Sequence, residues 1–189
     1  MLNQIRRQEI YPLLDMIKIE DSYWIVNNRF MAGEYPGSAD EQTALAKLEW
    51  LLSKDINFFI NLTEPGEYGL KPYETFFQWS HREDKVQVVC RNFPILDMST
   101  PSVSTMRLIL DTIDNALLAG KNIYLHCFGG IGRTGTVVGC FLVRHGMEPQ
   151  KALEKIALLR KNTPDGWRPS PETFKQRQMV LKWKEKSNK

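Results

Sequence analysis

One ten-residue stretch contains most of the side chains in this sequence that could do chemistry. It runs His126-Cys127-Phe128-Gly129-Gly130-Ile131-Gly132-Arg133-Thr134-Gly135, with five residues between the thiol and the arginine. Glycines lack the Cβ that would block a tight wrap, so several backbone N–H groups can point at one anion. Arg133 adds a planar fork of donors that fits two oxygens of a tetrahedral group. The stretch therefore predicts a cup for a phosphate-like anion, with a sulfur nucleophile beside it.

The same cup is expected to activate the sulfur of Cys127. The stretch leads into a predicted helix, and a helix N-terminus with a neighbouring cation favours the thiolate over the thiol. A Cys–His protease would need a histidine within reach of the sulfur. His126 ends a strand, where neighbouring side chains point to opposite faces, so we expect it to bond loop backbone instead. His81 and His145 are expected at the surface. The pattern favours attack on a phosphate ester without a separate base.

Four other interpretations of the loop are weaker. Gly130 to Gly135 matches the dinucleotide fingerprint G-x-G-x-x-G, but that motif needs an acidic residue at the end of a second strand about 20 residues later. Here Glu148 and Glu154 fall in a predicted helical region. A Walker-type loop would need Gly-Lys-Ser/Thr, which does not occur. A tight turn with an unreactive buried cysteine stays open, and a rhodanese-like sulfurtransferase ranks last because its loop lacks the downstream Arg-Thr.

Periodicity and turn residues predict the elements that position this loop. Apolar runs predict a hairpin and three strands, over residues 23–26 and 29–32, 56–62, 85–91 and 122–126. Predicted helices begin at a Ser38–Glu41 capping box, at Val103, at Arg133, at Pro149 and at Ser170-Pro171. This order is typical of an α/β fold with three layers, in which helices flank a mostly parallel central sheet of about four to five strands. Ligands bind such sheets beyond the carboxyl ends of the strands.

Length and composition set the broad class. The 189 residues carry a net charge of +3 and 42% hydrophobic residues, which fits one globular domain over 1–189. We expect an N-terminal arm over about 1–21 and a frayed tail over about 184–189. The charge balance argues against nucleic acid, and no apolar run suits a signal peptide or a membrane span. Three cysteines without zinc-site spacing favour a reduced, cytoplasmic setting. A monomer without metal or cofactor is expected.

His126-Cys127-x5-Arg133-Thr134 resembles the signature of the cysteine-based protein tyrosine phosphatase superfamily. The short chain resembles its compact dual-specificity branch, particularly the bacterial members. The resemblance implies phosphate transfer to Cys127, with Arg133 and the loop residues Phe128, Gly129, Gly130, Ile131 and Gly132 binding the phosphate oxygens. It also implies that the Thr134 hydroxyl stabilises the departing thiolate when the cysteinyl-phosphate is hydrolysed. Capping of the helix is an alternative role for Thr134.

The same resemblance implies an aspartic acid that protonates the leaving oxygen. Asp97 lies 30 residues before Cys127, at a strand end between two prolines, where a lid could form. Asp111 and Asp114 are weaker candidates on a helix, and a solvated loop role for Asp97 stays open. The tyrosine-specific Trp-Pro-Asp pattern is absent, which leaves the substrate open.

Two residues near the C-terminus complete the set of candidates. Gln176 resembles a glutamine that positions the hydrolytic water in some relatives, although a surface role is equally compatible. Arg168 is expected either to bind a second phosphate or to be solvated, and Trp167 to lie in the core or at the rim.

The expected function is hydrolysis of phosphotyrosine, with phosphoserine or phosphothreonine as further substrates in a phosphorylated protein or peptide. A phosphatase of phosphoinositides or of small phosphate esters is an alternative, as is a non-catalytic phosphate-binding module. Relatives that prefer polyphosphorylated lipids often have lysines in the loop, where this chain has Phe128 to Ile131. Cys90 and Cys140 are expected in the core, and a reversible disulfide of either with Cys127 stays open.

Overall fold

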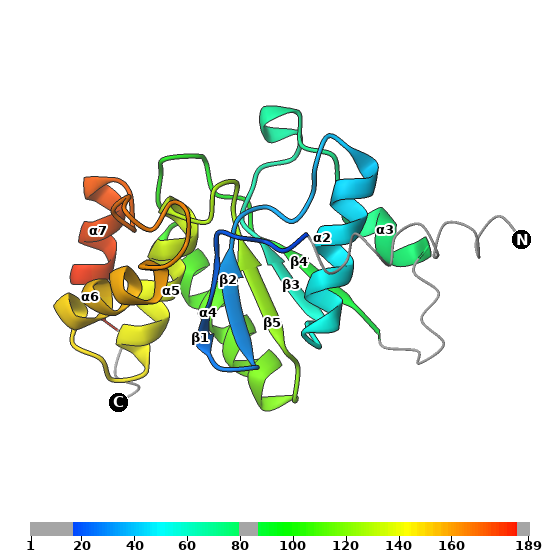
Figure 1. The fold of residues 1–189 in the computed structure, drawn as a ribbon. Helices are drawn as coiled ribbons and strands as arrows, with labels where there is room; N and C mark the ends of the chain where they lie inside the picture. The colour runs from blue at the N-terminus through cyan, green and yellow to red at the C-terminus, as the bar shows by residue number, and fades with distance from the viewer. Residues whose placement is uncertain (1–16, 80–86, 185–189) are drawn as a thin grey trace, which may run out of the picture.

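The computed structural model describes residues 17–79 and 87–184, and its described strands form one five-stranded sheet (Figure 1). The spatial order of the strands is β1-β2-β5-β3-β4. β2 is antiparallel to β1, whereas β2, β5, β3 and β4 pair in parallel. The strands are β1 (Ser22–Val26), β2 (Phe30–Gly33), β3 (Phe58–Asn61), β4 (Val89–Asn92) and β5 (Ile123–His126). The predicted hairpin and the mostly parallel sheet are confirmed.

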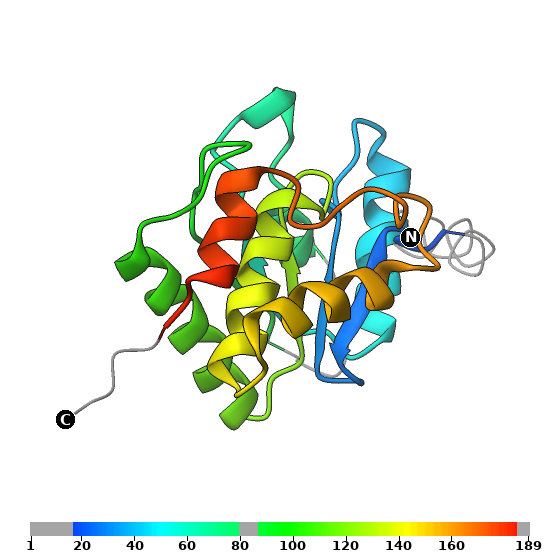
Figure 2. The same ribbon diagram turned by 90° about the vertical axis from the view of Figure 1, so that its left-hand side faces the viewer.

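Helices cover both faces of the sheet, as Figures 1 and 2 show from two sides. One face carries α4 (Val103–Leu118), α5 (Gly132–Arg144), α6 (Pro149–Arg160) and α7 (Phe174–Leu181). The other face carries α2 (Glu41–Ser53) and α3 (Glu74–Trp79). The predicted three-layer α/β arrangement is therefore confirmed.

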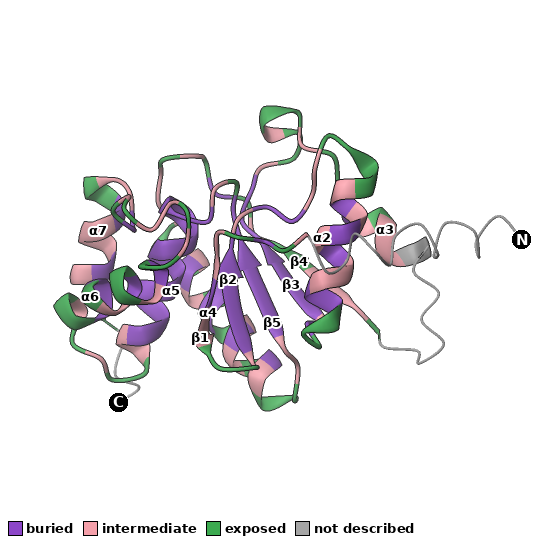
Figure 3. Cartoon of the chain, in the orientation of Figure 1, coloured by how far each residue is buried: buried purple, intermediate pink, exposed green. Residues whose placement is uncertain are grey.

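Alternate side chains of each strand build two separate cores. In β3, Phe58 and Ile60 pack with the α4–α7 layer, while Phe59 packs toward α2 and α3. In β5, Leu125 and Tyr124 divide in the same way. The central strands are buried on both faces (Figure 3), which is why they read as continuous apolar runs and not as alternating ones.

The register of the parallel strands brings four loops to one edge of the sheet. Gly33 of β2 and Asn61 of β3 both align with His126 of β5, and Asn61 also aligns with Asn92 of β4. These four residues end their strands, so the loops that follow them start at the same edge. Residues from distant parts of the chain can therefore meet around the loop that begins at Cys127.

Two helix starts differ from the sequence expectation. α2 is capped by Asp40, whose carboxylate accepts from the Thr43 N–H at 2.7 Å, and not by a Ser38 capping box. Ser38 instead accepts from the backbone N–H of Asp40. The charged carboxylate is the stronger acceptor, and it lies two residues closer to the apolar stripe of the helix.

α7 also begins later than predicted. Its capping box is formed by Thr173 and Gln176, and the helix starts at Phe174. The Ser170–Pro171 peptide bond is cis, and the Ser170 hydroxyl bonds the loop carbonyl of Ile131. The prediction that Ser170-Pro171 opens the helix is therefore wrong, because those residues contact the loop instead.

The start of β4 and the two ends of the chain also bear on the sequence expectations. β4 begins at Val89, later than the predicted 85–91 strand. His81, residues 1–16 of the predicted arm and the tail from residue 185 lie outside the described residues. The expectation of a frayed arm is wrong for the part that follows, because Ile19 is buried in the core and Asp21 accepts from the Asp165 N–H at 2.9 Å. Within the described ranges, every helix is too short or too polar to span a bilayer.

Candidate active site

The loop from Cys127 to Ile131 joins β5 to α5 and is packed tightly against the rest of the molecule. Gly130 has φ +68°, and a Cβ there would overlap the backbone of Gly33 and Glu34 at the end of β2. The carbonyl of Phe128 accepts from the Tyr35 N–H at 2.8 Å. Glycine is required at 130 both for its conformation and for the close approach. The loop is thereby held rigidly at the sheet edge.

The segment before α7 supports the loop from its other side. Ser170 donates from its hydroxyl to the carbonyl of Ile131 at 2.7 Å, and a Cβ at Gly135 would overlap that hydroxyl oxygen. The buried side chain of Gln176 lies directly against Gly132. Ile131 is the N-cap residue of α5, and its apolar side chain accepts no hydrogen bond from the first turn. The first-turn N–H groups of α5 can therefore donate to an anion bound in the loop.

A cavity of about 490 Å³ opens at this edge and contains the predicted chemistry. Its wall includes Cys127, Asp97 and Arg133, together with Phe128, Gly129, Ile131 and Gly132 of the loop. Cys127 and Arg133 are both buried. Gly130 packs on β2 instead of lining the cavity. The loop thus forms the predicted cup, with the sulfur and the guanidinium in its wall.

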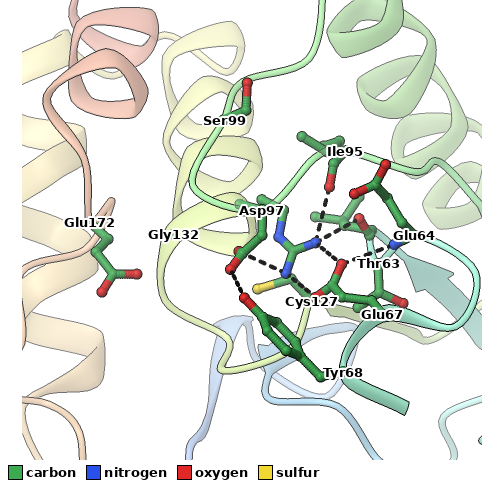
Figure 4. Close-up of polar contacts among 12 residues, drawn as sticks. Thr63, Glu64, Glu67, Tyr68, Ile95, Asp97, Ser99, Cys127, Gly132 and Glu172 are labelled. Carbon is green, nitrogen blue, oxygen red and sulfur yellow. Dashed lines mark hydrogen bonds and ion pairs between the residues drawn. The ribbon is translucent and has the colours of Figure 1, made fainter. Parts of the chain in front are cut away.

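Arg133 is fixed by a glutamate that sequence analysis did not identify. Its Nη1 and Nη2 donate to Oε2 and Oε1 of Glu67, each at 2.6 Å, and Nη1 also donates to the carbonyl of Ile95 at 3.0 Å (Figure 4). Burial alone would lower the pKa of Arg133, but the hydrogen bonds and charge of Glu67 raise it above its ordinary value. Arg133 is therefore a permanently charged, pre-oriented donor.

Asp97 meets the same guanidinium from the loop after β4. Its Oδ1 lies 2.9 Å from Nη2 of Arg133, and its Oδ2 accepts from the Tyr68 hydroxyl at 2.7 Å. Figure 4 shows Asp97, Tyr68 and Glu67 gathered around Cys127. Asp111 and Asp114, the weaker candidates, pair with Arg144 on the surface of α4 and α5. The structure thus places Asp97, and not the helical aspartates, at the cup.

Two buried polar atoms lie at the start of α5, directly after the loop. In the part of the chain that the structure describes, Nε of Arg133 and the hydroxyl of Thr134 have no hydrogen-bond partner. Buried polar atoms without partners are costly, so they usually mark a site that is completed by a ligand or by chemistry. A tetrahedral anion and a thiolate are the groups that would satisfy these two donors.

His126 supports the loop as a neutral side chain. Its Nε2 lies 2.7 Å from the Tyr73 hydroxyl, and its Nδ1 lies 3.3 Å from the carbonyl of Cys127. Because that carbonyl can only accept, Nδ1 carries the proton and Nε2 accepts from Tyr73. Burial lowers the pKa of His126 to about 3. The expectation that His126 bonds loop backbone is confirmed.

Gln176 is buried and engaged at both ends of its amide. Its Nε2 donates to the carbonyl of Ser99 at 3.0 Å, and its Oε1 accepts from the Thr173 N–H. It therefore connects α7 to the loop that carries Asp97, which excludes the surface role. Water positioning by Gln176 stays a prediction.

The remaining candidates lie around the cup. Arg168 reaches the cavity wall, where it is paired with Asp165 at 3.1 Å and Glu172 at 2.6 Å. Trp167 is exposed, so the core alternative for it is wrong. Cys140 is in the core as expected, whereas Cys90 is half-buried, and burial raises the pKa of Cys90 to about 12. All three cysteines are free thiols.

Glu67 and Tyr68 are the site residues that sequence analysis missed. They lie in the turn Glu64–Leu70 that follows β3, where the sequence was interpreted only as a strand end. A signal was available: Gly66 and Gly69 bracket a glutamate and a tyrosine at the carboxyl end of a parallel strand. In such folds, loops at that edge carry function.

We expect Glu67→Gln to lower the free energy of unfolding by about 3 kcal/mol, because it leaves a buried guanidinium without its main carboxylate. Glu67 and Arg133 are nearly inaccessible, with side chains 7% and 1% exposed. Urea unfolding followed by circular dichroism measures the loss. The matched control is Glu67→Gln combined with Arg133→Met, which removes both charges and should recover most of the stability. Equal losses in the single and double variants would contradict a strong buried pair.

Among the described residues, no group of three or more His, Cys, Asp or Glu side chains is arranged so that it could hold a metal ion.

Comparison with known proteins gives a consistent picture. A family model described as "Polymorphic toxin system, DSP-PTPase phosphatase" matches residues 34–147. PTEN1 of Arabidopsis thaliana, named a phosphatidylinositol 3,4,5-trisphosphate 3-phosphatase and protein-tyrosine-phosphatase, is 32% identical over 109 residues, covering 57% of this chain and 26% of that protein. The dual specificity protein phosphatase CDC14A of Mus musculus is 25% identical over 151 residues, covering 72% of this chain and 22% of that protein.

A solved structure extends the similarity to the fold. The crystal structure of Tk-PTP in the active form superposes with a TM-score of 0.64 at 25% identity, covering 85% of this chain and 93% of that one. The chain spans about half or less of the length of the curated relatives that it matches.

Proposed function

Since the chain belongs to the dual-specificity part of the cysteine-based protein tyrosine phosphatase superfamily, we propose that it hydrolyses phosphate monoesters through a cysteinyl-phosphate on Cys127. The single observation that carries this proposal is the convergence of Cys127, Arg133 and Asp97 on one cavity. Its substrates are phosphotyrosine residues of a phosphorylated protein. Phosphoserine and phosphothreonine, whose shorter side chains reach less far into the cup, are further substrates. A single domain acting as a monomer in the cytoplasm suffices for this role.

The first step is displacement at phosphorus. The thiolate of Cys127 attacks phosphorus in line with the leaving oxygen, an S–P bond forms and the P–O ester bond breaks. Arg133 and the loop N–H groups hold the equatorial oxygens, where negative charge is spread in the transition state. Asp97 gives its proton to the departing oxygen, so that an alcohol or phenol leaves instead of an anion.

The second step returns the enzyme to its starting state. Asp97, now a carboxylate, takes a proton from water while the water oxygen attacks phosphorus and the S–P bond breaks. Inorganic phosphate and the Cys127 thiolate result, and the Thr134 hydroxyl is available to donate to that sulfur. The unpartnered Thr134 hydroxyl supports this role.

Charge in the cavity wall supports substrates with one phosphate over polyphosphorylated head groups. Outside the cup, the cations of the wall are Lys47 and Arg168, and each is paired with carboxylates, Lys47 with Glu34 at 2.9 Å. A second phosphate would have to displace these partners. Phosphoinositides are thus the less favoured substrate class.

A substrate panel tests the proposal. Phosphotyrosine, phosphoserine and phosphothreonine peptides, phosphoinositides and p-nitrophenyl phosphate are assayed with the wild-type chain. We expect phosphate release from the phosphotyrosine peptide and from p-nitrophenyl phosphate, with inhibition by vanadate and none by a metal chelator. Phosphate binding without turnover of any substrate would instead identify a non-catalytic binding module.

A further inference from the structure

Tyr68 occupies an unusual position for an aromatic residue. It has φ +49° in the short helical turn Glu67–Gly69, between Gly66 at φ +74° and Gly69 at φ +71°. Left-handed backbone is unfavourable for a bulky side chain and tends to persist where the surrounding contacts require it. Met98, directly after Asp97, is also left-handed at φ +58°. Two backbone segments are therefore bent into unfavourable conformations where Tyr68 and Asp97 meet.

The contacts of Tyr68 explain this conformation better than burial does. Tyr68 is 67% exposed, so packing in the core does not hold it. Its hydroxyl donates to Oδ2 of Asp97 at 2.7 Å, and its ring centroid lies 4.9 Å from that of Phe128 in the loop. The ring contact fixes the direction of the phenol, and the phenol fixes one oxygen of the Asp97 carboxylate.

The two oxygens of Asp97 face different demands during turnover. Oδ1 lies on Nη2 of Arg133, a donor that the substrate's phosphate also needs. A phosphate dianion entering the cup competes with Oδ1 for this donor and repels the carboxylate. After that exchange, the Tyr68 hydroxyl is the remaining hydrogen bond that the structure shows for Asp97.

We propose that Tyr68 is a positioning residue for the acid step: its hydroxyl keeps Asp97 at the mouth of the cup when the substrate's phosphate replaces Asp97 on Arg133. The inference rests on the proposed function and adds a residue to it. Tyr68 neither touches phosphorus nor transfers the proton in this scheme. Removing the Tyr68 hydroxyl should therefore lower kcat most for substrates whose leaving group needs a proton from Asp97.

The protonation state of the phenol suits this role. The hydrogen bond to Asp97 and the charge of that carboxylate raise the pKa of Tyr68 above its ordinary value of 10.0. Tyr68 stays protonated at neutral pH and is the donor of the pair. The acidic and basic groups that face it are Asp97, Glu67 and Arg133.

The test is Tyr68→Phe assayed on two aryl phosphates of similar shape, phenyl phosphate and p-nitrophenyl phosphate. Phenolate is a poor leaving group that needs the acid, whereas p-nitrophenolate leaves readily without it. We expect kcat for phenyl phosphate to fall about tenfold, as for loss of a hydrogen bond to a charged group. For p-nitrophenyl phosphate, kcat should fall less than about twofold, and the inhibition constant for inorganic phosphate should be unchanged. In an Asp97→Asn background, Tyr68→Phe should change kcat for phenyl phosphate less than about twofold, since the acid is already absent.

Thr112→Val is the control, because it removes a hydroxyl that donates to the carbonyl of Leu108 at 2.8 Å on α4 and does not line the cavity. It should retain wild-type kcat on both substrates. The inference is overturned by an equal loss on the two substrates, by no loss on phenyl phosphate, or by an undiminished effect in the Asp97→Asn background. A wild-type chain that turns over neither substrate would instead remove the proposed function itself.

Discussion

Replacing Cys127 by serine should lower kcat for p-nitrophenyl phosphate by roughly four orders of magnitude or more, because the hydroxyl is not ionised at neutral pH and is a weak nucleophile there. The fold should persist, since serine differs from cysteine only in the side-chain heteroatom, and the cup is held by Gly130, Ser170 and Arg133. Steady-state rates and circular dichroism measure the two effects. Mass spectrometry of acid-quenched enzyme should detect phosphocysteine in the wild type alone.

Cys90→Ser provides the control for this substitution. Cys90 is a free, half-buried thiol in β4, and its raised pKa keeps it protonated at neutral pH. The Cys90→Ser variant should retain wild-type turnover. Substantial turnover by Cys127→Ser, or phosphate trapped on Cys90 instead of Cys127, would contradict the covalent step assigned here.

Asp97→Asn should lower kcat for phenyl phosphate by about 10²- to 10³-fold, the usual contribution of a positioned general acid. The affinity for inorganic phosphate should not weaken. It should increase, because the carboxylate that now competes for Nη2 of Arg133 becomes neutral. Initial rates give kcat, and competitive inhibition by phosphate gives the affinity. The two readouts are thus expected to change in opposite directions.

The helical Asp111→Asn is the matched control for charge removal. Asp111 pairs with Arg144 at 2.7 Å on the surface of α4, with its side chain 58% exposed, so little change in either readout is expected. An Asp97→Asn variant that loses phosphate affinity while kcat at saturation is preserved would show that Asp97 binds substrate and is not the acid.

Local sequence was sufficient to predict the cup. Its residues are consecutive, so the glycine spacing, the preceding apolar strand and the following helix all act within about ten residues of Cys127. The sheet could also be predicted, because buried parallel strands produce apolar runs separated by helical periodicity. The start of α7 could not, since Ser170 and Pro171 are held by a hydrogen bond to Ile131, which lies 39 positions earlier in the chain.

What surrounds Arg133 was decided by the tertiary structure. Glu67 lies 66 positions before Arg133 in the chain, and nothing in the local sequence marks it as the guanidinium's partner. The two meet because β3 pairs in parallel with β5, which brings the turn after Asn61 to the loop after His126. Asp97 and Tyr68 meet in the same way from the ends of β4 and β3. The sequence alone determined which residues form an anion cup. Strand order determined which side chains hold Arg133 and Asp97 in place, because hydrogen bonds between distant residues form only once the sheet has aligned them.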